Sequence, residues 1–250
     1  MRRFRQIIFI GCILLVSVQC GKDIEDPVPP STPVWVEKTA PESPVESGID
    51  ADPLGDYIVL QWHKNPDNDI SGYELYRTSV SSDSGFDHIA DIDVFTSSGV
   101  DTFYIDDSVR LETNYFYYLR AFDIAGNKSP RSDTIRYQII EKVDLTEPLG
   151  NIQELKPIFK WYDFSTVSYE YVIKIINIKT KEVIWISRLS RPNYGDLTQS
   201  VRYNFDNQAI QASLNSGSSY QWRVDAIALV DRNNVDLAGS ESFWGYFATE

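Results

Sequence analysis

Two stretches of the chain, 105 residues apart, carry the same strand pattern. In each, an aliphatic residue stands six positions before a tyrosine, and three aromatic or aliphatic residues follow that tyrosine at alternate positions. The first run is Val109, Tyr115, Tyr117, Leu119 and Ala121, and the second is Leu214, Tyr220, Trp222, Val224 and Ala226. Alternation of this kind places one set of side chains on one face of a β-strand. The sequence therefore predicts two copies of one β-rich unit.

Shorter strands upstream of each run repeat as well. Each copy has an alternating strand that ends in a tryptophan, followed by a polar turn and a further strand. The residues are Ile58, Leu60 and Trp62 before a strand at 72–76, and Phe159 and Trp161 before a strand at 169–176. No helical period competes with these patterns outside the N-terminus. Many short alternating strands separated by Gly, Asn, Asp and Ser are typical of a β-sandwich.

At these residues the chain resembles fibronectin type III domains. That family pairs a tryptophan on its second strand with a tyrosine that closes a corner of the sandwich. Trp62 and Tyr115 match this pair in the first copy, and Trp161 and Tyr220 match it in the second. The segment 121–129 also resembles the turn between the last two strands in many bacterial members.

The resemblance implies an all-β protein with two tandem fibronectin type III-like β-sandwiches, at 33–140 and 141–250. The chain departs from the family at Leu111, where proline is common, and in a weak first strand of the second copy. These departures leave the topology of the second domain open. Nothing in the connecting residues 138–149 fixes the angle between the two domains.

The N-terminus has the organisation of a signal peptide. Residues 1–5 carry three arginines and no acid, and residues 7–18 form a largely apolar run that ends just before Cys20. A helix that spans a bilayer needs about 20 apolar residues, so this run is too short to be a permanent anchor. We therefore predict a helical signal peptide at 1–19.

Around Cys20 the chain resembles bacterial lipoprotein precursors, in which such a cysteine is diacylated and becomes the new N-terminus. The family favours an aliphatic residue three positions before the cysteine and a small one directly before it, where this chain has Ser17 and Gln19. Cys12 follows the small Gly11 but leaves too short an apolar core for export. Cleavage as an ordinary secretory signal is the other alternative.

The resemblance implies lipidation at Cys20 and attachment to the bacterial outer membrane, with the chain either periplasmic or surface-exposed. Residues 20–32 include Pro27, Pro29 and Pro30. Proline-rich segments are extended and semi-rigid. We therefore expect this segment to be a spacer between the lipid and the first domain.

Charge and cysteine content exclude several classes of function. The formal net charge is −13, which repels phosphate backbones and anionic lipid headgroups, so we expect no nucleic-acid partner and a covalent membrane anchor. Cys12 and Cys20 are the only cysteines. A disulfide within the domains and a cysteine-rich metal site are both excluded. Aromatic residues make up 13% of the chain and can fill the cores instead.

Catalytic machinery is not evident in the sequence. His63 and His88 are the only histidines, and neither lies near a motif of the nucleophile-elbow kind. We expect His63 to point outward and His88 to lie on an edge strand, both as surface residues. Close pairs of carboxylates are unavoidable in so acidic a chain. We therefore predict a protein that is not an enzyme and uses no cofactor.

A cation site is a weaker possibility. Asp67 and Asp69 alternate in a way that resembles the start of a calcium loop. The family resemblance implies that Asp123 and Asn127 lie at the same end of the sandwich. The glycine and the distal glutamate of such a loop are missing. Asn and Asp are also the ordinary residues of tight turns. The turn interpretation is the stronger one.

The outward face of the first domain has the composition of a binding patch. If Tyr115, Tyr117 and Leu119 point inward, their neighbours point outward together with residues of the preceding strand. The candidate patch is Glu74, Tyr76, Phe116, Tyr118 and Arg120. Exposed aromatic residues with an arginine are enriched at interfaces. Cross-strand packing or coverage by the second domain are the alternatives.

The corresponding outward positions of the second domain are charged. They are Glu170, Lys174, Arg223 and Asp225, and we expect a solvated surface there.

These features favour a non-catalytic, envelope-anchored lipoprotein whose sandwiches act as a spacer and a protein-binding surface. Its partner would be an envelope or extracellular protein. The first alternative is a carbohydrate-binding accessory lipoprotein that uses the aromatic residues of the first domain. The second is a hydrolase whose site the sequence does not reveal.

Overall fold

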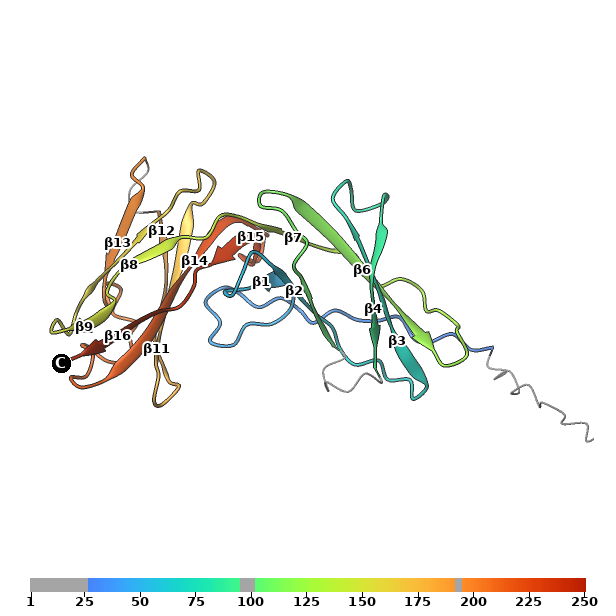
Figure 1. Ribbon diagram of the computed structural model, residues 1–250, viewed down its shortest axis with the longest axis horizontal. Helices are drawn as coiled ribbons and strands as arrows, with labels where there is room; N and C mark the ends of the chain where they lie inside the picture. Colours follow the sequence, from blue (N-terminus) through green and yellow to red (C-terminus); the bar gives the residue numbers. More distant parts are fainter. Residues whose placement is uncertain (1–26, 95–101, 192–194) are drawn as a thin grey trace, which may run out of the picture.

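The computed structural model describes residues 27–94, 102–191 and 195–250. These residues form an all-β protein, with no helix in the described ranges. Figure 1 shows two β-sandwiches joined end to end, with the first described residues, in blue, at the far end of the first sandwich. None of the described residues belongs to a helix that is long and apolar enough to cross a membrane. The predicted signal peptide and Cys20 lie outside the described residues.

The first sandwich packs a three-stranded sheet against a four-stranded one. The small sheet has the order β1 (Asp50–Ala51), β2 (Ile58–Gln61), β5 (Phe103–Asp106), and the large sheet has the order β7 (Ile135–Ile139), β6 (Asn114–Asp123), β3 (Ile70–Thr78), β4 (Asp87–Asp93). Alternate side chains of β6 are buried, as the sequence pattern predicts. They pack with Trp62 in one hydrophobic core, whose last residue in the sequence is Ile139.

The second sandwich repeats this arrangement. Its small sheet has the order β13 (Thr198–Arg202), β10 (Ile158–Tyr162), β8 (Asp144–Glu147). Its large sheet has the order β12 (Val183–Ser190), β11 (Glu170–Asn177), β14 (Ser219–Val230), with β15 (Asp236–Glu241) and β16 (Gly245–Thr249) both paired to β14. The second sandwich has a separate hydrophobic core, whose residues lie between Ile140 and Phe247 in the sequence.

The first strand of the second sandwich, which is weak in the sequence, is divided between the two sheets. β8 pairs with β10, whereas β9 (Gly150–Ile152) runs parallel to β16. A cis peptide bond between Glu147 and Pro148 lies between the two pieces. The indole of Trp222 donates a hydrogen bond to the Pro148 carbonyl at 3.0 Å.

The two predicted tyrosines close equivalent corners. Tyr115 accepts a hydrogen bond from the backbone N–H of Arg110 at 3.1 Å, and Tyr220 accepts one from Asn215 at 3.0 Å. Both bonds span five residues, because the offset from the preceding aliphatic residue is the same in both copies. Both rings are buried. The twin pattern of the sequence is thus one local structure formed twice.

The two sandwiches share a sheet. β7 at the edge of the first pairs in parallel with β15 of the second, through Gln138 with Ala238 and Ile139 with Gly239. The large sheets of both domains therefore form one continuous order of strands, from β12 at one end to β4 at the other (Figure 1). The angle that the sequence left open is fixed by backbone hydrogen bonds.

Buried ion pairs reinforce this junction. Glu46, from the loop before β1, bonds the Arg223 guanidinium through both carboxylate oxygens at 2.6 Å and also pairs with Lys174. Arg223 in turn binds Glu241 at 2.6 and 2.8 Å. Asp225 lies 2.9 Å from the same guanidinium.

The expectation of a solvated face in the second domain is therefore wrong. Lys174, Arg223 and Asp225 are only 4–6% exposed, because the loop of the first domain covers them. Glu170 stays half-buried and pairs with Arg188 at 2.6 Å.

A second ionic group lies beside the first. Lys38 contacts Asp50 at 2.6 Å and Asp236 at 3.2 Å, and so bridges the two domains. The Tyr137 hydroxyl donates a hydrogen bond to Asp236 at 2.5 Å. Burial lowers the pKa of the Lys38 ammonium, but the two carboxylates outweigh it and raise the pKa overall.

Removing either corner hydroxyl should destabilise its own sandwich. We expect Tyr115→Phe and Tyr220→Phe each to lower the free energy of unfolding by about 1 kcal/mol or more, since a backbone N–H loses its acceptor. Urea unfolding followed by tryptophan fluorescence measures this. Tyr246→Phe is the matched control, because Tyr246 is 55% exposed. Equal effects at all three positions would contradict a corner role.

The junction should also respond to pH. Burial raises the pKa of the Glu241 carboxyl well above its ordinary value, and Asp225 raises it further, against the opposing effect of Arg223. A carboxyl with a higher pKa in the folded chain stabilises the fold below its unfolded pKa of about 4.3 and loses that contribution as the pH rises. The wild type should therefore lose stability with rising pH relative to Glu241→Gln, which cannot titrate.

We expect the free energy of unfolding of Glu241→Gln minus that of the wild type to increase as the pH rises above the unfolded pKa of about 4.3, by at most about 1.4 kcal/mol per pH unit. Urea unfolding at several pH values gives this difference. Glu182→Gln, at an exposed turn, should follow the wild type. A difference that stays constant or falls with pH would disprove the raised pKa.

Candidate binding face on the first sandwich

The five residues of the predicted patch lie together on the outer face of the large sheet. β3 and β6 are antiparallel neighbours, and their register places Glu74 opposite Arg120 and Tyr76 opposite Tyr118. Phe116 lies two positions before Tyr118 in β6. All five side chains are half-buried. The second domain joins the sheet at β7, beyond β6, so this pairing leaves the β3–β4 side of the face uncovered.

The aromatic rings on this face contact one another closely. Tyr76 and Tyr118 stack with ring centroids 4.6 Å apart and an angle of 13° between their planes. Phe86 contacts Tyr118 at 4.8 Å, and the Arg131 guanidinium lies 5.8 Å from the centre of the Tyr118 ring. His88 meets Tyr76 edge to face at 5.2 Å. The rings form a preorganised cluster rather than separate side chains.

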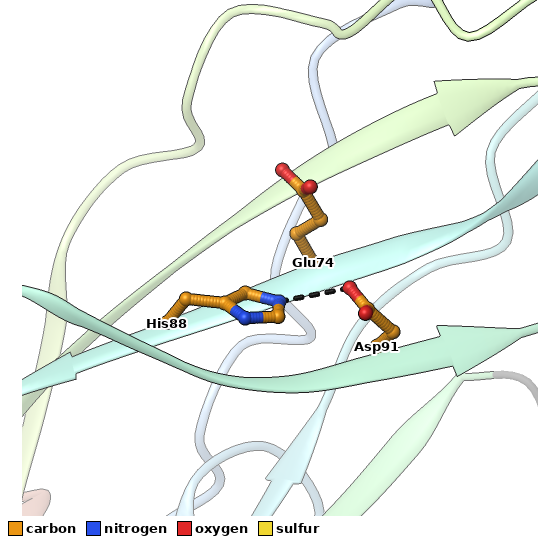
Figure 2. Close-up of side chains that lie close together, drawn as sticks. All are labelled: Glu74, His88 and Asp91. Atoms are coloured by element: carbon orange, nitrogen blue, oxygen red, sulfur yellow. Dashed lines mark hydrogen bonds and ion pairs between the residues drawn. The ribbon is translucent and has the colours of Figure 1, made fainter.

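A bulge in β4 brings two further polar residues onto the same face. Asp91 pairs with Glu74 and Ala90 with Leu75, but Tyr76 pairs with His88, so the register skips Ile89. In a regular strand, residues three apart point to opposite faces. The extra residue of the bulge reverses this alternation. Figure 2 shows His88 and Asp91 directed toward one another beside Glu74, whose carboxylate points away from this pair.

Hydrogen bonds hold this polar group in place. The Lys128 ammonium contacts one Glu74 carboxylate oxygen at 2.6 Å, and the Tyr76 hydroxyl donates to the other at 3.0 Å. His88 Nε2 lies 2.8 Å from the Asp91 carboxylate. Burial raises the pKa of Glu74, but the bonds from Lys128 and Tyr76 outweigh it, and the pKa is lowered. Burial and the bond to Glu74 raise the pKa of Tyr76 to about 12.

The residues of the possible calcium site serve turns instead. Asp123 accepts hydrogen bonds from the backbone of Ala125 and from Asn127, at 2.8–2.9 Å. Asp67 accepts one from the backbone of Ser31 at 2.6 Å. In the part of the chain that the structure describes, Asp67, Asp69 and Asp123 do not form a group of carboxylates within ligand distance. The Asp123 contacts are those of a tight turn, whereas the Asp67 carboxylate holds the segment at Ser31, 36 residues upstream.

Among the described residues, two groups have three potential metal ligands close together. One is Glu74, His88 and Asp91, and the other is Glu46, Asp225 and Glu241 at the junction. The junction carboxylates already bind Arg223 and Lys174, so protein cations occupy the place of an ion. The first group lies at the surface, and the side chains of His88 and Asp91 are 41% and 63% exposed.

The sequence predicted that the five central residues share one face, but it did not predict the residues at the border of that face. Both histidines are exposed, as predicted, and His88 lies on the edge strand β4. His88 and Asp91 lie on the same face as Glu74 because of the bulge in β4. No spacing in the sequence indicates this bulge. Lys128 and Arg131 reach the face from the segment between β6 and β7.

Comparisons with known proteins extend only to the fold. No protein-family model and no curated protein matches the chain. Among solved structures, a two-domain fibronectin type III segment of chicken tenascin aligns at 15% identity and a TM-score of 0.30, covering 80% of this chain and 97% of that one. The FN1–FN3 domains of chicken CNTN1 align at 16% identity and a TM-score of 0.30, covering 89% and 68%. The chain is thus an all-β protein with distant structural similarity to tandem fibronectin type III domains.

Proposed function

We propose that this chain is a non-catalytic lipoprotein of the bacterial envelope that presents the β3–β4–β6 face of its first sandwich to a protein partner. Lipidation at Cys20 and the spacer 20–32 would attach it to the outer membrane. The two sandwiches would hold the face at a fixed distance and orientation. The cluster formed by the rings of Tyr76, Tyr118 and Phe86 is the observation that carries the proposal.

The stiffness of the domain pair supports a role in presentation. Domains joined by a single linker usually move relative to one another. Here the strands β7 and β15 pair directly, and buried ion pairs join Glu46 to Arg223 and Lys38 to Asp236. A rigid arm lowers the entropy that is lost when a partner binds.

The packing of the rings favours a protein over a carbohydrate. Sugars bind aromatic residues by stacking on an open ring face. Tyr76 stacks on the Tyr118 ring, the Arg131 guanidinium lies over the same ring, and His88 packs against Tyr76. The cluster thus offers ring edges, a phenol hydroxyl and charged groups. Tyrosine and arginine in this setting are enriched at the energetic centres of protein interfaces.

Lipidation at Cys20 is tested by substitution. Cys20→Ser should abolish incorporation of a labelled fatty acid and release the protein from the membrane fraction of a Gram-negative host. Cys12→Ser is the control and should leave both unchanged, because Cys12 would be removed with the signal peptide. Mass spectrometry of the mature N-terminus gives the cleavage position. A mature chain that begins downstream of Cys20 would refute the anchor.

The binding face is tested by Tyr118→Ala on the lipidated protein. We expect binding to its envelope partner, quantified after cross-linking and pull-down from intact membranes, to fall at least about tenfold, as for a residue at the centre of an interface. Tyr162→Ala on β10 is the matched control, because Tyr162 is 42% exposed and lies on the other domain. Unchanged circular dichroism should accompany both variants.

The same two variants separate the carbohydrate alternative. If the chain binds glycans on an array and Tyr118→Ala abolishes that binding, the face recognises sugar and the protein-partner proposal is wrong. Equal loss of partner binding in Tyr118→Ala and Tyr162→Ala would place the interface elsewhere.

A further inference from the structure

We propose that Glu74, His88 and Asp91 form a binding site for a divalent transition-metal ion, of which Zn²⁺ is the expected example. The site lies beside the stacked tyrosines on the candidate binding face (Figure 2). It concerns an ion bound by the chain itself, so it holds whether or not the proposed protein partner exists.

The geometry suits a small ion. One ligand atom from each of the three side chains lies within 4.8 Å of the other two. In a tetrahedral zinc site with bonds of about 2.0–2.2 Å, ligand atoms lie about 3.4 Å apart. The most widely separated ligand atoms therefore need to close by up to about 1.4 Å, and His88 and Asp91 need to open by about 0.6 Å. His88 and Asp91 already approach to 2.8 Å.

The backbone positions the ligands without a flexible loop. Glu74 comes from β3, and the other two ligands come from the neighbouring strand β4, with Asp91 directly opposite Glu74. The bulge at Ile89 places His88 on the same face of the sheet as Asp91. Without it, the two side chains would point to opposite faces. Bulges commonly redirect side chains at functional sites.

The ligand chemistry selects the class of metal. One imidazole nitrogen and two carboxylates match the mixed sets that bind zinc and other late transition metals. Ca²⁺ and Mg²⁺ prefer sites made only of oxygen, so His88 argues against them. Three protein ligands leave a fourth position open, for water or for a group of a bound partner.

Tyr76 contacts two of the ligands, as residues just outside the ligand set do at metal sites. The Tyr76 hydroxyl donates to one oxygen of Glu74 at 3.0 Å, which orients the carboxylate and leaves the other oxygen for the ion. The ring of Tyr76 packs against the His88 ring at 5.2 Å. Partners of this kind fix the orientation of the ligands and contribute to affinity.

Lys128 competes for the site in the absence of metal. Its ammonium contacts the Glu74 oxygen at 2.6 Å, and its side chain is 50% exposed. The ion pair is worth little at such exposure, and the flexible side chain can move into solvent. Metal binding would therefore exchange one weak ion pair for three coordination bonds.

The test is a zinc titration of the full-length chain in detergent, with Cys12 and Cys20 alkylated so that neither thiol binds metal. We expect the wild type to bind one Zn²⁺ per chain. His88→Ala and Asp91→Asn should each weaken binding by more than about tenfold, the lower limit for loss of an outer-shell partner. Lys128→Met should strengthen it by about two- to fivefold, because the competing ion pair is removed.

His63→Ala is the matched control, since His63 is exposed on the same domain but lies outside the cluster. It should leave the affinity unchanged. Nuclear magnetic resonance of the two histidine side chains should show zinc-dependent shifts of His88 and none of His63. The proposal is overturned if the wild type binds no more tightly than His88→Ala, if His63→Ala loses binding, or if Lys128→Met weakens it. Because none of these measurements involves a partner, their outcome is independent of the Tyr118→Ala experiment.

Discussion

The relative placement of the two sandwiches depends on one junction, in which the pairing of β7 with β15 is reinforced by the buried guanidinium of Arg223. Only 5% of its side chain is exposed, and a charge in that position costs several kcal/mol unless it is paired. Its partners come from both domains, Glu241 from the second and Glu46 from the first. A shift of the domains that displaced Glu46 while Arg223 stayed buried would leave that charge without its partner from the first domain. A pair of this kind specifies one arrangement more than it adds to stability.

This arrangement determines which surfaces of the first domain remain available. The junction covers the β7 edge of the large sheet of the first domain and the loop that carries Glu46. The opposite edge of the same sheet is β4, at the far end of the continuous strand order. The aromatic cluster and the group around His88 lie toward that end. The junction and the candidate face thus divide one sheet between a structural and a binding role.

The sequence predicted the features that arise from local periodicity. The alternation after Tyr115 and Tyr220 defines strands whose inward faces are fixed by hydrophobic burial alone, and both corners follow from it. Contacts that depend on distant segments were not predictable in the same way. Lys174 and Arg223 occupy outward positions, and only the arrival of Glu46, from more than a hundred residues upstream, makes them interior. No pattern near either residue carries that information.

The residues of the candidate site were likewise predictable only in part. Tyr76 and Tyr118 follow from strand parity, but Asp91 and His88 share a face only because β4 contains a bulge. Edge strands are protected from pairing with other chains by charged residues and bulges, and the acidic residues of β4 meet that need. Edge protection requires charge along the strand, but it does not require that an imidazole and two carboxylates from adjacent strands converge within 4.8 Å. That convergence, next to a preorganised ring cluster, is what distinguishes this edge as a site.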